Sequence, residues 1–526
     1  MQIIPPQFEL DLSNASGTTL ATGGALALGV ILATHHLLKD KKGVKPRKIH
    51  RPDSTLPILG NALDVSKGHQ FHDWMVEQSL KFNNEPWMWT VPGSSQVVVC
   101  TPEAFEEVTI TQQDVFIKGK FQIERIEHLL GRGLVASDGE RWHRQRKAGV
   151  KFFSSRTLRA FMTQAMKKNM GQVQNVMENS IKTGEQVDLH KLFHDFTMQT
   201  FMEMGVGIEL DWIGRKEPNP FEVAVDKGTM IVNRRFRIPE FQWKLERYLN
   251  VGEEKILAGY LDTIYSFMNR VVQESLDRVT AKKANDENTK PIEGKDVIKS
   301  VVELFVEQSA DAEGLRPEDL VEFLLTFVLA ARDTTALTLA WFFYELSRQP
   351  EIEEKIRKEL AEKLNVDKDT YLTTEHAREL TYMEAVIKET LRYYPAGPYT
   401  MRQATKDTVI CGDIFIKKGQ VVGLSTVAMN RNPDVWGPDA HVFKPERWID
   451  PETGNIINMP AHKFFTFGAG PRACIGMSLA MMELRVIIAN LIHKYRFDVD
   501  PSNDGSYFAA IALNMQNPLF TNVRRA

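Results

Sequence analysis

The sequence predicts a mainly helical protein with a smaller, segregated β-sheet, an α+β arrangement that follows a single membrane anchor near the N-terminus. Helical periodicity dominates the chain, strand-like stretches are short and grouped, and one uncharged apolar segment lies close to the start. The 526 residues allow a large core, and the net charge of -3 gives no reason to expect nucleic acid as a partner. Three cysteines, Cys100, Cys411 and Cys474, provide no disulfide framework and favour a reducing compartment.

Segment 18–38 is expected to be a membrane-spanning helix. It contains no Asp, Glu, Lys or Arg, and a helix of its 21 residues spans about 31 Å, close to a bilayer's hydrocarbon core. Residues 39–48 carry six basic side chains and one acid, so the positive-inside rule puts the rest of the chain in the cytosol and residues 1–17 in the lumen. Asn14 then begins a glycosylation sequon on the lumenal side. A cleaved signal peptide is the alternative, but no basic region precedes the apolar run.

Proline-rich sequence follows the anchor. Pro46, Pro52 and Pro57 lie within residues 39–60, which predicts a basic, stiff spacer instead of a helix. The folded body is then expected to comprise residues 61–526, where no internal repeat occurs.

The main elements of the body follow from periodicity and turn signals. The Pro92-Gly93-Ser94 sequence predicts the turn of a strand pair. In chain order, we expect strands within 88–100, helices at 153–180, 187–204 and 253–283, a loop at 285–296, and further strands within 408–422.

One predicted helix is unusually long and apolar. Pro317 suits its first turn and Pro350 suits a stop just past its end, and the 33 residues from 317 to 349 span about 50 Å. A second membrane span is disfavoured because Arg332 and Asp333 lie in the middle, where each costs about 3 kcal/mol. A helix through the protein core is expected instead, and buried charge in such a helix is usually functional or paired.

Residues 465–476, FTFGAGPRACIG, fit two kinds of site. Gly468, Gly470 and Ala473 form a GxGxxA pattern between the strand-like KFFTF and a helical stretch, as in a dinucleotide-binding loop. Too few residues follow for the rest of such a domain, and Pro471 removes an amide that a phosphate would need. The pattern is therefore a weak indication of nucleotide binding.

The other interpretation is a metal site at Cys474. A thiolate at a helix N-terminus is stabilised by the helix dipole and by unpaired amides. Gly470 and Gly476 allow a flat ligand to approach the backbone, and Phe467 can shield the sulfur. A single cysteine without a companion ligand argues against structural zinc and suits haem iron held by one axial thiolate.

The motif Phe467-x-x-Gly470-x-Arg472-x-Cys474-x-Gly476 is similar, position by position, to the haem-binding signature of the cytochrome P-450 family. Three further motifs occur in the family's order: AARDTT at 330–335, with Ala331 where glycine is usual, ETLR at 389–392, and FKPERW at 443–448. The resemblance covers about residues 50 to 526. It implies the cytochrome P-450 fold, haem b as cofactor and a monooxygenase that activates O2.

The resemblance assigns roles that the residues themselves support. It makes Cys474 the axial iron ligand and implies that Asp333 and Thr334 deliver protons during oxygen activation. Thr334 can hydrogen-bond to the carbonyl of Ala330 and open a groove in the helix. The remaining cofactor contacts that it implies are Trp142, Arg146, Arg402, Arg472, Phe467, Gly470 and Gly476.

A structural cluster is also implied. Glu389 and Arg392 are spaced to share one helix face, and Arg447 from the later motif is expected to join them in a buried group. Taken alone, the pair would more often be solvated at the surface. In the same way, Trp142 and Arg146 alone would fit a basic amphipathic surface helix.

Two stretches, 138–161 and 327–350, resemble long-chain fatty-acid hydroxylases of plants, fungi and related eukaryotes. This implies hydroxylation of a fatty acid or alkane near its terminus. We expect the alkyl chain to lie along apolar walls at 116–126, 398–400 and 511–515. The expected contacts are Phe116, Ala330, Pro398, Thr400 and Leu513.

The resemblance also implies partners and a location. No flavin or NADPH module is fused to the chain, so electrons are expected from NADPH through NADPH–cytochrome reductase at the endoplasmic reticulum membrane, with cytochrome b5 as a further candidate partner. The alternatives are a sterol or xenobiotic oxidase, a haem-thiolate isomerase or dehydratase that uses no O2, and a non-catalytic haem protein that carries a ligand.

His190 and His194 have the spacing of metal ligands on a helix, next to Asp195. No third ligand is suggested, and the surrounding sequence is amphipathic. Structural histidines are the favoured interpretation.

Overall fold

The computed structural model describes residues 46–67, 70–154, 156–286, 300–308, 319–509 and 511–526. The described residues from Lys48 onward belong to one compact unit. The predicted anchor at 18–38 and Asn14 lie outside the described residues, as does most of the predicted loop at 285–296. Part of the predicted spacer packs on the body, because the amide of His50 donates to the carbonyl of Pro86 at 3.0 Å and His50 pairs with Trp87.

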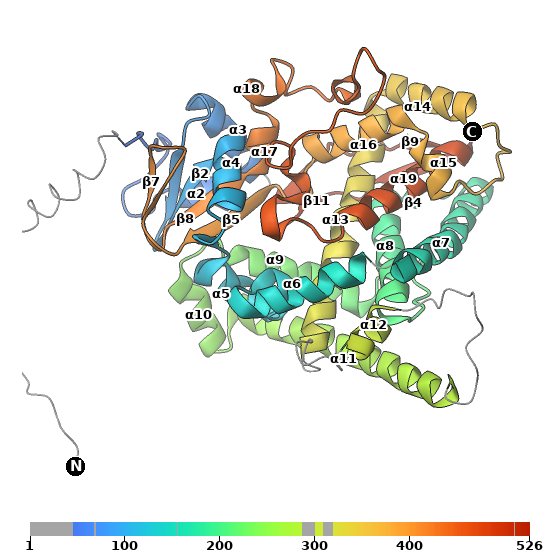
Figure 1. Cartoon of the computed structure of the whole chain (residues 1–526), viewed down its shortest axis with the longest axis horizontal. Helices are drawn as coiled ribbons and strands as arrows, with labels where there is room; N and C mark the ends of the chain where they lie inside the picture. The colour runs from blue at the N-terminus through green and yellow to red at the C-terminus, as the bar shows by residue number, and fades with distance from the viewer. Residues whose placement is uncertain (1–45, 68–69, 155, 287–299, 309–318, 510) are drawn as a thin grey trace, which may run out of the picture. The chain divides into compact units, whose positions relative to one another are not determined.

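Helices make up most of the described chain (Figure 1). The helices are α2 (Ala62–Ser66), α3 (Phe71–Lys81), α4 (Pro102–Glu106), α5 (Gly119–Leu130), α6 (Gly139–Phe153), α7 (Arg156–Thr183), α8 (Leu189–Val206), α9 (Pro220–Arg234), α10 (Glu240–Tyr248), α11 (Gly252–Asp286), α12 (Val301–Gln308), α13 (Leu320–Arg348), α14 (Pro350–Lys363), α15 (Thr374–Arg378), α16 (Thr381–Tyr393), α17 (Thr426–Asn430), α18 (Pro433–Trp436) and α19 (Met477–Lys494).

The strands form small, separate sheets. The strands are β1 (Trp87–Val91), β2 (Ser94–Val99), β3 (Phe116–Ile117), β4 (Val187–Asp188), β5 (Tyr399–Ala404), β6 (Thr408–Ile410), β7 (Ile414–Ile416), β8 (Val421–Ser425), β9 (Tyr495–Val499), β10 (Tyr507–Ala509), β11 (Leu513–Met515) and β12 (Phe520–Arg525). The largest sheet has the order β1-β2-β8-β5-β3, in which only β2 and β8 run parallel. A mainly helical body with small segregated sheets confirms the α+β part of the predicted fold class, while the membrane anchor stays a prediction.

The β1–β2 hairpin shows how sequence sets the sheet. Trp87, Trp89 and Val91 alternate with less buried residues, so one face of β1 packs into an apolar cluster. Val91 pairs with Ser94 across the turn, and Gly93 has a φ of 82°, a conformation that suits glycine.

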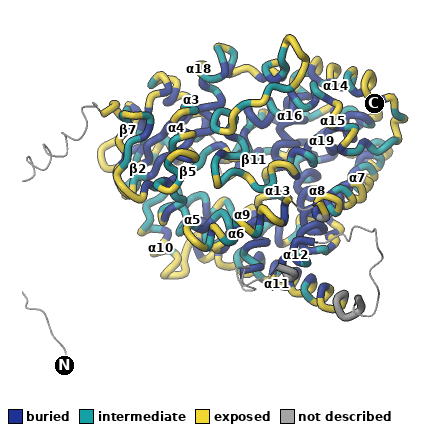
Figure 2. Tube along the Cα trace, viewed as in Figure 1, coloured by how far each residue is buried: buried dark blue, intermediate teal, exposed yellow. Residues whose placement is uncertain are grey.

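Helix α13 passes through the middle of the helical body, with α8, α16 and α19 packed against it (Figure 1). Its residues are apolar on nearly every side, which fits burial on all faces. Among the described residues it is the one helix long and apolar enough to cross a membrane, and 72% of its apolar window is buried inside the protein. Figure 2 shows the buried stretches along these central helices and the exposed residues on the outer elements.

Several predicted boundaries move. The expected helix at 153–180 is α7, which starts at Arg156 after α6 has ended, and the helix expected at 187–204 is α8, which starts at Leu189 after the short strand β4. The strand predicted from KFFTF is wrong, because Phe465–Phe467 forms a single turn of 3-10 helix. Phe465 packs edge-to-face on Phe105 with ring centroids 4.8 Å apart, so its apolar residues serve the core without pairing in a sheet.

Candidate active site

The loop before α19 holds Cys474 in a fixed turn. The amide of Cys474 donates to the carbonyl of Phe467 at 2.7 Å. Gly470 has a φ of 68°, and a Cβ there would lie 2.1 Å from the carbonyl oxygen of Thr109. The loop therefore requires glycine at position 470.

The Cys474 side chain faces an open space although protein surrounds it closely. The residue is exposed, yet burial raises the pKa of its thiol, opposed by the amides of Gly476 and Met477 and by the charge of Arg146. The exposure of Cys474 and the desolvation of its thiol are consistent with each other when the sulfur points into a space enclosed by protein. The opposing groups are those that would stabilise a thiolate at a helix N-terminus.

Helix α6 packs directly on this loop. Arg146 Nη1 donates to the carbonyl of Ala473 at 2.6 Å. Trp142 is buried, and the guanidinium of Arg472 lies over its ring at 4.2 Å from the centroid. The structure thus brings together Trp142, Arg146 and Arg472, which a solvated surface helix would not do.

Cations outnumber acids beside the loop. Arg472 Nη2 bonds to Asp138 at 2.5 Å, while Arg402 is buried and bonds to the carbonyl of its neighbour Met401 at 2.8 Å. Burial and the charge of Arg472 lower the pKa of Arg402 to about 10, and burial together with the same two arginines holds the pKa of Lys118 well below its usual range. Three cations around one carboxylate form a site for further anionic groups.

This donor set fits a haem. The Cys474 thiol would bind the iron, the glycine loop allows close approach, and the excess of cations suits two propionates. Lys118 and Asp138 were missed from the sequence, because neither belongs to a recognisable motif and they meet the predicted arginines only through the fold.

Helix α13 has an accessible notch at Ala330 and Thr334, whereas most of its other residues are buried. The hydroxyl of Thr334 donates to the carbonyl of Ala330 at 2.8 Å, as the sequence suggested. This bond competes with the regular helical ladder for the carbonyl of Ala330, and both residues are accessible.

Asp333 lies beside the notch in a polar cluster. Arg332 Nη1 bonds to Asp333 at 2.9 Å and to Asp226 of α9 at 2.7 Å. His194 Nδ1 lies 3.6 Å from the carboxylate of Asp333. Burial raises the pKa of Asp333 to about 6, although Arg332 opposes the rise, so the carboxyl group can exchange a proton near neutral pH.

The His190 and His194 rings contact each other, with centroids 4.7 Å apart. Burial lowers the pKa of both, so both rings are neutral at neutral pH. No group of three metal-ligating side chains occurs in the part of the chain that the structure describes. His194 and Asp226 were not recognised from the sequence as neighbours of Asp333, because they come from other helices.

Glu483 is a second buried acid near α13 that the sequence did not reveal. It lies on α19, is bonded to Thr335, and burial raises its pKa to about 8. The available signal was a single acid within the apolar stretch 479–492.

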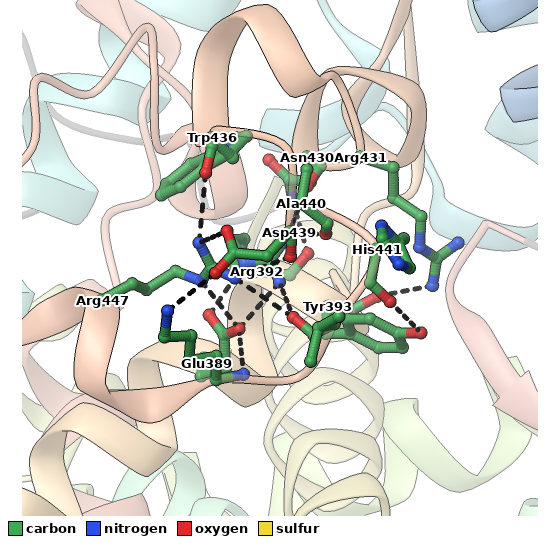
Figure 3. A network of polar contacts seen from close by, with 12 residues as sticks. Glu389, Arg392, Tyr393, Asn430, Arg431, Trp436, Asp439, Ala440, His441 and Arg447 are labelled. Atoms are coloured by element: carbon green, nitrogen blue, oxygen red, sulfur yellow. Dashed lines mark hydrogen bonds and ion pairs between the residues drawn. The ribbon is translucent and has the colours of Figure 1, made fainter.

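Glu389, Arg392 and Arg447 meet in a buried network (Figure 3). Arg392 bonds to both carboxylate oxygens of Glu389 at 2.7 and 2.8 Å, and Arg447 Nε bonds to Glu389 at 3.0 Å. Arg392 also donates to the carbonyls of Asn430 at 2.5 Å and Ala440 at 2.8 Å. The network therefore ties α16 to the segment that leads toward the Cys474 loop.

A pocket with mostly apolar and aromatic walls lies between α5, the end of α9 and β5. Its walls include Phe71, Trp89, Ile126, Phe236, Tyr399 and Ile511. Each predicted wall therefore contributes to the pocket: Gln122 and Ile126 come from 116–126, Tyr399 from 398–400 and Ile511 from 511–515.

The individual substrate contacts chosen from the sequence do not line this pocket. Phe116 packs in the core of the sheet and Pro398 is buried. Thr400 lies on β5 but does not line the pocket. The carbonyl of Leu513 accepts a hydrogen bond from the indole of Trp341 at 3.0 Å. Ala330 lies at the notch of α13 instead. Neighbouring strand residues point to opposite faces, and the sequence does not assign which face lines a pocket, so these five substrate contacts stay predictions.

Comparisons with known proteins agree with this geometry. A family model described as Cytochrome P450 matches residues 50–514. Cytochrome P450 704B1 of Arabidopsis thaliana is 30% identical over 90% of this chain and 94% of its own length. Cytochrome P450 monooxygenase cyp1 of Mycosarcoma maydis is 28% identical over 90% of this chain and 74% of its own, and Cytochrome P450 94A1 of Vicia sativa is 26% identical over 84% of each.

Proposed function

The chain belongs to the cytochrome P450 family of oxygen-incorporating oxidoreductases, and on that premise we propose that it hydroxylates a long-chain fatty acid or alkane near its terminus. The observation that carries the proposal is the pair of accessible sites, the Cys474 thiol and the notch at Thr334, in an otherwise packed core. The mostly apolar walls of the pocket support a lipophilic substrate.

The haem, when bound, supplies the activation of dioxygen and the transfer of one oxygen atom to the substrate. Cys474 would hold the iron, and Arg146 and the amides of Gly476 and Met477 would stabilise the negative charge of its thiolate. The cations at Lys118, Arg402 and Arg472 are placed to bind the propionates.

Proton delivery is assigned to α13. The carboxyl group of Asp333 takes up and releases a proton near pH 6, and the Thr334 hydroxyl positions a proton donor at the notch. Arg332 and Asp226 connect Asp333 to the surface, because Asp226 is 56% exposed. Apolar pocket walls exclude water from the substrate and hold it in place.

We assign the electrons to NADPH through NADPH–cytochrome reductase, with cytochrome b5 as an additional donor, at the endoplasmic reticulum membrane. Exposed apolar side chains support a membrane-facing surface: Ile58 is 93% exposed, and on α10 Phe241 is 72% and Tyr248 is 84% exposed. Alkaline extraction of membranes and glycosylation at Asn14 would test the anchor and its orientation.

The test of function is reconstitution with reductase. We expect NADPH-dependent hydroxylation of long-chain fatty acids or alkanes and a substrate-induced shift of the Soret band. NADPH consumption coupled to product excludes a ligand carrier, and a strict need for O2 excludes an isomerase or dehydratase. If sterols or xenobiotics are oxidised and no long-chain substrate is, the proposed substrate class is wrong.

A further inference from the structure

The pocket has one strongly charged side chain in its described walls, Arg237, which follows α9 in the connection to α10. No aspartate or glutamate is among the described lining residues. His72 also lines the pocket, but burial lowers its pKa to about 3, so it is neutral at neutral pH. The pocket is thus apolar with a single positive charge.

The two arginines before Arg237 have carboxylate partners. Arg234 forms two bonds with Glu246, at 2.8 and 2.9 Å, and Arg235 forms two with Glu254, at 2.8 and 2.6 Å. These pairs fix the turn at the end of α9 and hold the backbone of the arginine segment in place.

Arg237 differs from both. Within the described residues its guanidinium makes no hydrogen bond or ion pair. The nearby carboxylate of Glu253 attracts it electrostatically but forms its ion pair with Arg234, at 3.5 Å. Burial lowers the pKa of Arg237, yet a guanidinium stays charged at any pH that the fold tolerates. A partly desolvated cation without a partner is costly, and a planar anion would relieve that cost.

We propose that Arg237 binds the carboxylate of a fatty-acid substrate and sets which end of the chain is oxidised. This proposal rests on the proposed hydroxylase function and narrows its substrates from lipophilic molecules in general to those with a carboxylate head. The head lies at the α9–α10 connection, and the alkyl chain runs along the walls formed by Ile126 and Tyr399. Oxidation is then directed away from the carboxylate.

The experiment compares hexadecanoic acid, its methyl ester and hexadecan-1-ol by Soret-shift titration of the haem-loaded protein. We expect the acid to bind about 10- to 100-fold more tightly than the ester, the usual effect of a hydrogen bond to a charged group. Arg237→Leu is expected to remove this preference by weakening the binding of the acid, and Arg237→Lys to retain part of it. Arg215→Leu is the matched control, because Arg215 pairs with Asp211 on the surface, its side chain is 51% exposed and it does not line the pocket, so this variant should keep the preference.

The outcomes separate the two proposals. Equal binding of acid and ester by the unaltered protein overturns the carboxylate site, whether or not the Leu variant folds. If the ester and alcohol are still hydroxylated in that case, the hydroxylase function stands without it. If none of the three compounds binds or reacts, the hydroxylase function itself fails. A preference that persists in Arg237→Leu also overturns the assignment to Arg237.

Discussion

The hydroxyl of Thr334 donates a 2.8 Å hydrogen bond to the carbonyl of Ala330, one turn earlier in α13. Thr338 makes the same kind of bond to the carbonyl of Thr334, also at 2.8 Å, but it is buried. Two threonines on one helix therefore share a local geometry, and only one of them reaches an accessible space.

This pair gives a matched test of proton delivery. Thr334→Val keeps the shape and removes the hydroxyl, so we expect product per NADPH to fall about tenfold or more, with hydrogen peroxide released instead. Thr338→Val should leave that ratio unchanged. A Thr334→Val protein that remains fully coupled would exclude the hydroxyl from proton delivery.

Asp333 predicts a pH dependence. Its pKa is raised to about 6 by burial and is held down by Arg332, so the carboxyl group loses its proton as the pH rises through about 6. We expect the rate of product formation to change around that pH and Asp333→Asn to be slow, without this inflection. Arg332→Leu removes the opposing charge and should move the inflection to higher pH. A shift to lower pH would contradict the electrostatic assignment.

Gly470 predicts a steric effect on the haem loop. Gly470→Ala puts a Cβ 2.1 Å from a backbone oxygen of Thr109, and we expect a loss of about 3 kcal/mol in unfolding free energy, or loss of haem. Gly454→Ala is the control, because its φ of 70° is similar but nothing lies within 4 Å. Thermal unfolding and haem content measure the difference, and equal effects would mean that only backbone conformation matters.

Glu389 predicts a large structural effect. Glu389→Gln leaves Arg392 buried without a carboxylate partner and leaves Arg447 with Asp439 alone, and breaking such a network costs about 3–5 kcal/mol. We expect a lower unfolding temperature and reduced haem retention. Glu362→Gln, which removes an exposed pair with Lys358, should change little. A stable, haem-loaded Glu389→Gln protein would show that the cluster is dispensable.

Glu483 predicts how stability depends on pH. Its pKa is about 8 in the folded protein against a usual 4.5, so the folded state keeps a proton that the unfolded state releases as the pH rises above about 4.5. Its contribution therefore favours folding at low pH and is lost between about pH 4.5 and 8. Glu483→Gln should raise the unfolding temperature more at pH 8 than at pH 5. A difference that does not grow with pH would mean that the carboxyl group is ionised in the fold.

Features that lie close together in the sequence could be predicted. The Cys474 loop, the Thr334–Ala330 bond and the Glu389–Arg392 spacing depend on a few adjacent residues. Asp226 and Lys118 could not be predicted, because each reaches the site from a distant segment. The sequence indicated which segments contribute to the pocket walls, but not which of their residues face inward, because that depends on strand register. Thr400 was therefore chosen as a contact, whereas its neighbour Tyr399 lines the pocket.

The extensive packing of α13 against α8 has a consequence for biosynthesis. Helix α13 is strongly apolar, and while it is exposed on the nascent chain it can bind chaperones or aggregate. Because α8 ends at Val206 and α13 begins at Leu320, the cover is translated well before the segment that it protects. The nascent chain can therefore cover one side of α13 as soon as this helix emerges.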